Sequence, residues 1–126
     1  MSTLRKVNNI LELVGNTPLV RITRMNPAPS VELLVKLESM NPGGSVKDRI
    51  GLKMIEQAEA SGQLTPGKIV LEASSGNTAI GLAMVCAVKG YRLLVTMSEF
   101  ASKERRRILQ AYGVQILLTP GYQGTD

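Results

Sequence analysis

The sequence predicts an α/β protein with an open parallel sheet and helices on both faces. Apolar runs of strand length alternate along the chain with helix-like runs of about a dozen residues. The inner strand-like runs are apolar at nearly every position, which is typical of parallel strands covered on both faces. The chain has 126 residues, the length of one domain, and its 44% of apolar residues is enough for a hydrophobic core.

Several short features precede the first long helix. Residues 10–13 read as helical, and residues 15–18 have dense turn chemistry before a short strand at 19–22. Two closely spaced prolines make residues 26–30 a loop. The β-branched and Leu-rich run 31–38 then reads as a strand.

The later elements follow from the spacing of their apolar residues. In the run 46–60, residues such as Ile50 and Met54 recur at helical spacing, which predicts an amphipathic helix covering a sheet. The run 79–88 is apolar nearly all round and predicts a buried helix. The other predicted elements are strands at 68–72, 92–96 and 114–119 and a helix at 102–112.

The loop 41–45 is the first candidate for a functional segment. Its Pro42 disfavours helical geometry in the preceding residue, and the glycines that follow allow a tight turn. Ser45 is a good N-cap, and Asp48 three residues later suggests a capping box with Asp in place of Glu or Gln. This arrangement places Lys47 in the first turn of the helix.

Lys47 has two interpretations at this point. It is either a surface lysine on a capped helix or a reactive amine. A positive charge is unfavourable near the electropositive N-terminus of a helix. A lysine that gives up its proton readily is the kind that forms Schiff bases with carbonyl compounds.

Residues 74–78, Ser-Ser-Gly-Asn-Thr, form a second candidate segment between a predicted strand and a predicted helix. Free backbone N–H groups and small hydroxyls at a helix N-terminus bind anions such as carboxylate or phosphate. An ordinary N-cap with a flexible turn is the alternative. Because ligands in open α/β sheets lie beyond the carboxyl ends of the strands, we expect this segment and the loop 41–45 to meet at one sheet edge.

Composition narrows the classes of function. The chain has no histidine, which excludes Ser-His-Asp and Cys-His catalysis and the common histidine metal sites. The net charge is +5, but only 3% of residues are aromatic, which argues against a nucleic-acid reader. A basic cluster is interpreted as a solvated helix face rather than a nucleic-acid contact; its members are Lys103, Arg105, Arg106 and Arg107.

Cellular context is predicted from Cys86 and from the apolar runs. A single cysteine cannot form a disulfide within the chain, which fits a reducing compartment, and its apolar surroundings predict a small buried residue. The N-terminus lacks the apolar core of a signal peptide, and no apolar run is long enough to span a bilayer. A cytoplasmic protein without membrane contact is expected.

Several motifs, in this order along the chain, resemble the cysteine synthase and cystathionine β-synthase family. They are GNTPLV at 15–20, KLE at 36–38, NPGGSVKDR at 41–49, EASSGNT at 72–78, MSE at 97–99, ERR at 104–106 and AYG at 111–113. Members of this family are fold-type II enzymes that use pyridoxal phosphate. The sequence PGGSVKDR is closer to B-type cysteine synthases, the O-acetylserine sulfhydrylases, than to the A type.

The resemblance implies a role for each site residue. Lys47 would be the catalytic lysine, which holds pyridoxal 5'-phosphate and moves protons at the substrate α-carbon. Asn77 would bind the ring hydroxyl of the cofactor. The substrate α-carboxylate would be bound by Ser74, Ser75, Gly76 and Thr78. The reaction would be β-replacement: an activated serine such as O-acetylserine reacts with sulfide or a thiol to give cysteine or a related amino acid.

The resemblance also implies a domain organisation. The chain is less than half the family's length, and the loop that cradles the cofactor phosphate comes later in the family. Residues 1–38 would pack on a large C-terminal domain that this sequence lacks, so Leu11, Leu13, Leu19 and Ile22 would lack their usual partners. Residues 39–126 would form the small α/β domain carrying the lysine.

Three interpretations of the chain remain. It is a truncated or partial form of a cysteine synthase-type transferase or lyase, with a small amino-acid substrate. Alternatively, it is an inactive fragment or split subunit that acts by association with copies of itself or with a complementary chain. The third interpretation is a small basic binding module.

Overall fold

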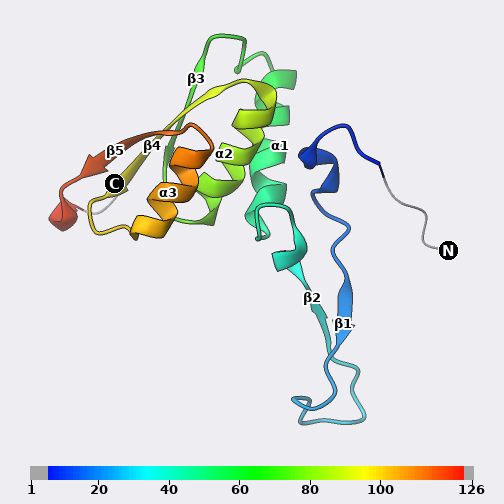
Figure 1. Ribbon diagram of the computed structural model, residues 1–126. Helices are drawn as coiled ribbons and strands as arrows, with labels where there is room; N and C mark the ends of the chain where they lie inside the picture. The colour runs from blue at the N-terminus through cyan, green and yellow to red at the C-terminus, as the bar shows by residue number, and fades with distance from the viewer. Residues whose placement is uncertain (1–5, 124–126) are drawn as a thin grey trace.

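The computed structural model describes residues 6–123, which form three longer helices, five strands and three short 3-10 turns (Figure 1). In order they are η1 Ile10–Leu13, β1 Leu19–Arg21, β2 Leu34–Lys36, η2 Glu38–Met40, α1 Lys47–Ala60, β3 Ile69–Ala73, α2 Asn77–Lys89, β4 Arg92–Ser98, α3 Lys103–Ala111, β5 Gln115–Thr119 and η3 Gly121–Gln123. Within this described part, no helix is long and apolar enough to cross a membrane.

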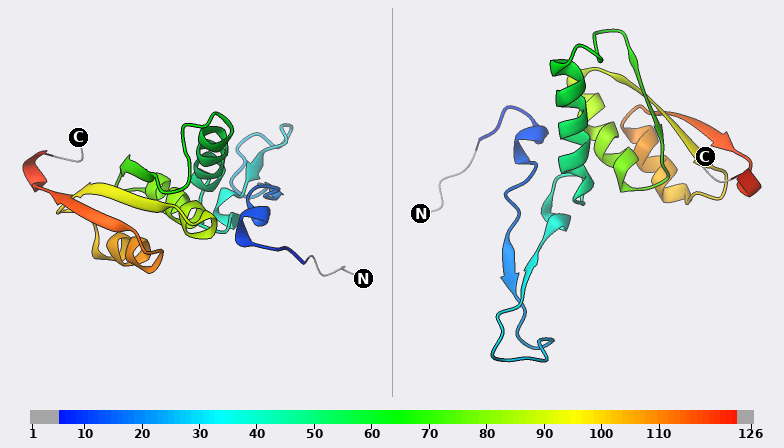
Figure 2. Two further views of the ribbon diagram at one scale, coloured as in Figure 1. Left: turned by 90° about the horizontal axis from the view of Figure 1, so that it is seen from above. Right: turned by 180° about the vertical axis from the view of Figure 1, so that it is seen from behind.

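Strands β3, β4 and β5 form a parallel sheet in that order. The register places Leu71 beside Leu94, and Leu94 beside Gln115. Seen from above, α3 lies on one side of the strands and α1 on the other (Figure 2, left). The predicted α/β class, with a parallel sheet and helices, is confirmed.

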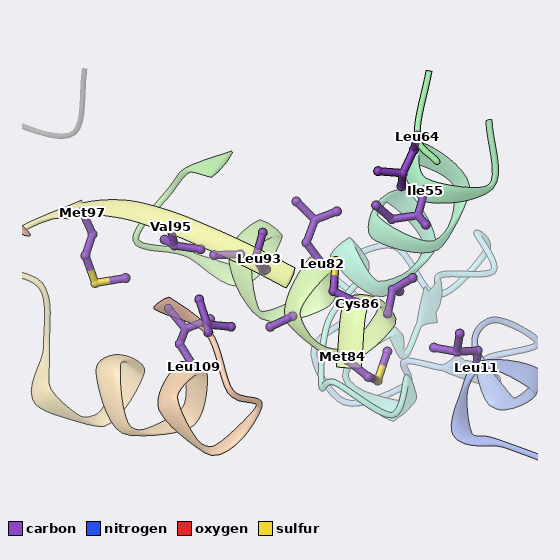
Figure 3. Close-up of a cluster of buried hydrophobic side chains, with 14 residues drawn as sticks. Leu11, Ile55, Leu64, Leu82, Met84, Cys86, Leu93, Val95, Met97 and Leu109 are labelled. Carbon is purple, nitrogen blue, oxygen red and sulfur yellow. The ribbon is translucent and has the colours of Figure 1, made fainter. Parts of the chain in front are cut away.

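The core lies between β4 and the helices. In β4, Leu93, Val95 and Met97 alternate with half-buried residues and are themselves buried. Figure 3 shows them on the same side of the strand as Leu109 of α3. The six residues 81–86 of α2 are all buried, because this helix packs against α1 as well as β4 and α3. The prediction of a buried helix is confirmed.

The strand predicted at 31–38 is shorter and belongs to a different sheet. Strand β2 pairs antiparallel with β1, with Leu19 opposite Lys36, and the two form a separate hairpin that projects from the rest of the molecule (Figure 1). All residues of both strands are exposed. Strands β1 and β2 follow each other in sequence and pair as an antiparallel hairpin. The expectation that the loop 41–45 follows a strand of the parallel sheet is therefore wrong.

The apolar residues of the N-terminal segment differ in burial. Leu11 of η1 is buried, with 9% exposed, and belongs to the core because η1 packs on α2. Leu11 therefore has packing partners within this chain. Leu19 in the hairpin is 61% exposed, and Leu13 is also exposed.

Candidate active site

Two glycines let α1 and α2 approach each other closely. A Cβ atom added to Gly81 would lie 2.7 Å from the backbone oxygen of Lys47, and one added to Gly51 would lie 2.9 Å from the carbonyl carbon of Gly81. No side chain fits at such distances. Lys47 is the first residue of α1, and Asn77 begins α2 one turn before Gly81, so the backbone of Lys47 lies against the first turns of α2.

The crossing of α1 and α2, not a shared sheet edge, sets where the two candidate segments lie, since each segment precedes one of these helices. The segment 74–78 follows β3 of the parallel sheet, whereas the loop 41–45 follows η2 outside it. The contact between α1 and α2 is the most extensive between any two described elements. The expectation that the two segments meet at one edge of the parallel sheet is wrong.

The loop before Lys47 is held by Asp48 rather than by a capping box. The Ser45 hydroxyl accepts a hydrogen bond from the Lys47 N–H at 3.1 Å, and Val46 occupies the N-cap position. Asp48 Oδ2 accepts from the N–H of Gly43 at 2.5 Å. The predicted capping box is wrong, because Ser45 is not the N-cap and the Asp48 side chain binds the N–H of Gly43 instead of that of Ser45.

Asp48 is fully buried, with 0% exposed. Its Oδ1 atom has no hydrogen-bond partner among residues 6–123. Burial raises the pKa of the Asp48 carboxyl above its usual range, although the Gly43 N–H acts in the opposite direction. A Cβ atom on Gly43 would lie 2.5 Å from Oδ1, so this position has room only for glycine.

A polar cluster around Glu38 ties the N-terminal segment to α1. Arg49 donates to both carboxylate oxygens of Glu38, from Nε at 2.8 Å and from Nη2 at 3.0 Å. Thr17 Oγ1 donates to Glu38 Oε1 at 2.6 Å, and Asn41 Nδ2 donates to Oε2 at 2.9 Å. These bonds, with Arg49 first, lower the pKa of Glu38 from 4.5 to about 2. Asn41 Oδ1 accepts from the Gly15 N–H at 2.8 Å and extends the cluster to the preceding turn.

The Glu38 cluster was not predicted from the sequence. Its members, Thr17, Glu38, Asn41 and Arg49, all lie in motifs that carry the family resemblance. The burial of Thr17 and Asn41 is the strongest indication that such a cluster exists, since buried polar residues need hydrogen-bond partners. Burial cannot be read from these short polar motifs without the fold.

The N-terminus of α2 is open to an anion. Its N-cap is Gly76, which offers no side-chain acceptor, and the Gly76 N–H donates to Ser74 Oγ at 3.1 Å. By contrast, Ser102 caps α3 by accepting from the Arg105 N–H at 3.4 Å. Asn77 is exposed, and its neighbours in the segment 74–78 are half-buried. First-turn N–H groups without a cap, beside small hydroxyls, are suited to a carboxylate or phosphate.

Cys86 is a buried free cysteine in α2. Burial raises the pKa of the Cys86 thiol from 9.0 to about 11, so the prediction of a small buried residue is confirmed. Among the residues that the structure describes, no group of three His, Cys, Asp or Glu residues could hold a metal ion.

The parallel α/β core and the lysine beside an uncapped helix N-terminus suit an enzyme that attaches a carbonyl cofactor and binds an anionic substrate. The sequence pattern described as "Pyridoxal-phosphate dependent enzyme" matches residues 10–126. The chain belongs to this family.

Within this family, the chain is similar to cysteine synthases and to an enzyme that produces hydrogen sulfide. The chain is 51% identical over 117 residues to a cysteine synthase of Staphylococcus aureus, covering 93% of this chain and 38% of the relative. A cysteine synthase from Entamoeba histolytica superposes with a TM-score of 0.93 at 41% identity, over 99% of this chain and 38% of that one. A hydrogen sulfide-producing enzyme from Fusobacterium nucleatum gives 0.90 at 46% identity, over 98% and 41%. The chain thus spans about two fifths of the length of these relatives.

Proposed function

We propose that this chain carries the lysine and the substrate-binding turn of a pyridoxal-phosphate-dependent enzyme of the cysteine synthase type. The observation that carries the proposal is the close contact between the Lys47 backbone and Gly81. This contact places the first residue of α1 about one helical turn from the N-terminus of α2, which has no side-chain cap. A lysine-bound cofactor and an anion site together would bind an amino acid through its amino group and its α-carboxylate, which fixes its orientation.

The residue types present suit the cofactor and substrate. Lys47 would hold the cofactor and later move the proton at the substrate α-carbon, and Asn77 would bind the ring hydroxyl of the cofactor. The substrate α-carboxylate would be bound by Ser74, Ser75, Gly76 and Thr78. When bound, pyridoxal phosphate supplies an electron sink for the α-carbon of the amino acid.

The proposed reaction is β-replacement on an activated serine such as O-acetylserine, with sulfide or another thiol as nucleophile. The names of the relatives support this choice, since two are cysteine synthases and one produces hydrogen sulfide. We place the activity in cysteine biosynthesis, in the cytoplasm. The relatives that carry this activity in their names are longer, and this chain covers 38% of the cysteine synthase of Staphylococcus aureus.

A second candidate function is association with another protein chain without catalysis by this chain alone. The observation in its favour is exposed apolar surface. Leu19 and Val20 are exposed on the hairpin, and Leu71 and Leu117 are exposed on the sheet. A second copy of this chain or a complementary chain is the proposed partner.

The test is cofactor attachment, measured without turnover. We expect pyridoxal phosphate added to the chain to give a visible absorbance band, and borohydride treatment to add the cofactor mass to the peptide containing Lys47. Lys47→Ala should abolish both signals. Lys53→Ala is the matched control, because Lys53 is exposed in the same helix and should change neither.

Absence of the band at millimolar cofactor would show that this chain alone is not the catalyst, and the second candidate would then be favoured. Attachment at Lys53 instead of Lys47 would contradict the proposal outright.

A further inference from the structure

The basic start of α3 reaches the proposed substrate turn. Arg105 Nη1 donates a hydrogen bond to the backbone oxygen of Ser75 at 3.2 Å, across 30 residues of sequence. Its own N–H is bound by the Ser102 hydroxyl. Arg107 is also exposed in the same helix, yet no side-chain hydrogen bond or ion pair involves it within the described part of the chain. The interpretation of the whole basic cluster as a solvated helix face is therefore incomplete.

The contact fixes the peptide group between Ser75 and Gly76. Its oxygen accepts from Arg105, and its N–H donates to Ser74 Oγ at 3.1 Å. Both polar atoms of this peptide are thus occupied just before the first turn of α2. The N–H groups of Asn77 and Thr78, which follow, have no side-chain cap. The peptide is held in one orientation while the donors next to it stay free.

The charge of Arg105 matters as well as its hydrogen bond. A carbonyl oxygen beside a bound carboxylate repels it, and a guanidinium on that oxygen offsets the repulsion. The same cation adds to the positive end of α2. Both effects favour a ligand with a negative charge at this turn over a neutral one.

We propose that Arg105 is a positioning residue that makes the turn 74–78 selective for amino acids with a free α-carboxylate. This inference rests on the proposed function of the turn. It assigns to α3 a part in recognising the charge of the substrate, whereas Lys47 and Asn77 act on the cofactor.

The experiment compares an amino acid with its amide. The ¹⁵N-labelled chain, loaded with pyridoxal phosphate, is titrated with L-alanine and with L-alaninamide, and the amide shifts of Gly76, Asn77 and Thr78 give the affinity. We expect Arg105→Gln to bind L-alanine about tenfold more weakly, the size of one charge-assisted hydrogen bond, with L-alaninamide binding nearly unchanged. Arg107→Gln should match the parent chain for both ligands.

Two further measurements separate charge from folding. Arg105→Lys keeps the charge without the planar fork and should recover part of the preference for L-alanine. In the parent chain, affinity for L-alanine should fall with added sodium chloride more steeply than in Arg105→Gln. If Arg105→Gln does not fold, Arg105→Lys is compared with the parent chain: a reduced preference for L-alanine over L-alaninamide supports the inference, and an unchanged preference overturns it.

The outcomes distinguish this inference from the proposed function. If the parent chain shows no shifts at 74–78 with L-alanine, the turn is not a carboxylate site and both are overturned. If the parent chain binds L-alanine and Arg105→Gln binds it within twofold, only the inference is overturned. An equal loss for alanine and alaninamide also overturns it, because that pattern reflects damage to the fold.

Discussion

At the scale of single residues, two carboxylates, Asp48 and Glu38, fix the backbone around the loop 41–45 in different environments. Asp48 is buried with one hydrogen bond, and Glu38 is bound by several donors. Asp48 is fully buried with one oxygen bound to the Gly43 N–H and the other unpartnered among the described residues. Glu38 has four side-chain hydrogen bonds from three partners. Burial without a cation raises the pKa of Asp48, whereas donors and a guanidinium lower the pKa of Glu38.

Asp48→Ala should destabilise the protein by about 1–3 kcal/mol, because it leaves the Gly43 N–H without its acceptor. Asp48→Asn is the matched control, since its amide oxygen can still accept that hydrogen bond, and it should lose less. Urea denaturation at pH 7 measures both. Equal losses for the two variants would show that the charge of Asp48, not the acceptor, holds the loop.

Glu38→Gln should flatten the acid side of the stability profile. The folded pKa of Glu38, about 2, lies below its ordinary value of 4.5, so folding is favoured where the unfolded carboxyl is already ionised. This contribution is fully present above about pH 4.5 and is lost as the pH falls toward about 2. Urea midpoints between pH 2 and pH 7 measure it. Glu32→Gln, in the exposed ion pair with Arg21, is the control. A profile of Glu38→Gln parallel to that of the parent chain would contradict the assignment.

At the scale of elements, the sequence predicted the helices better than the sheet membership of the strands. Helix 46–60 was placed within one residue of α1, because its apolar spacing is local information. The apolar run 31–38 predicts a strand, but it does not show which strand it pairs with, and β2 pairs with β1 outside the parallel sheet. The glycine crossing of α1 and α2 was also missed. An isolated Gly51 or Gly81 in a helix shows no partner in the sequence, and only the fold reveals the close approach.

Gly81→Ala should destabilise the protein by about 1–3 kcal/mol, although alanine is the better helix former. The added Cβ would lie 2.7 Å from the Lys47 backbone oxygen, so α1 and α2 must move apart. Gln57→Ala raises helix propensity at an exposed site of α1 and is the control, with a change within about 0.5 kcal/mol. Urea denaturation gives the stability, and the cofactor absorbance band reports whether Lys47 is displaced. A Gly81→Ala chain as stable as the parent would show that the helices are not in backbone contact.

At the scale of the whole molecule, the face of the parallel sheet opposite α3 is open and apolar, because α1 packs mainly on α2 and not over the strands. Ile69 and Leu71 alternate with half-buried residues of β3, and the register sets Leu71 next to Leu94. Leu117 is exposed two residues beyond Gln115, the neighbour of Leu94. Leu71 alone is 65% exposed. Contiguous apolar surface of this kind is uncommon on monomers and favours association.

We therefore expect the chain to associate with copies of itself, so that its sedimentation coefficient rises with concentration. Leu71→Ser combined with Leu117→Ser should shift this rise to higher concentration, because both substitutions remove apolar area from the open face. Arg92→Ser is the control, since Arg92 is the register partner of Ile69 on β4 and contributes charge rather than apolar contact. If the double variant associates as strongly as the parent chain, the hairpin residues Leu19 and Val20 become the better candidates. A parent chain that sediments as a monomer at every concentration would show that neither surface drives association.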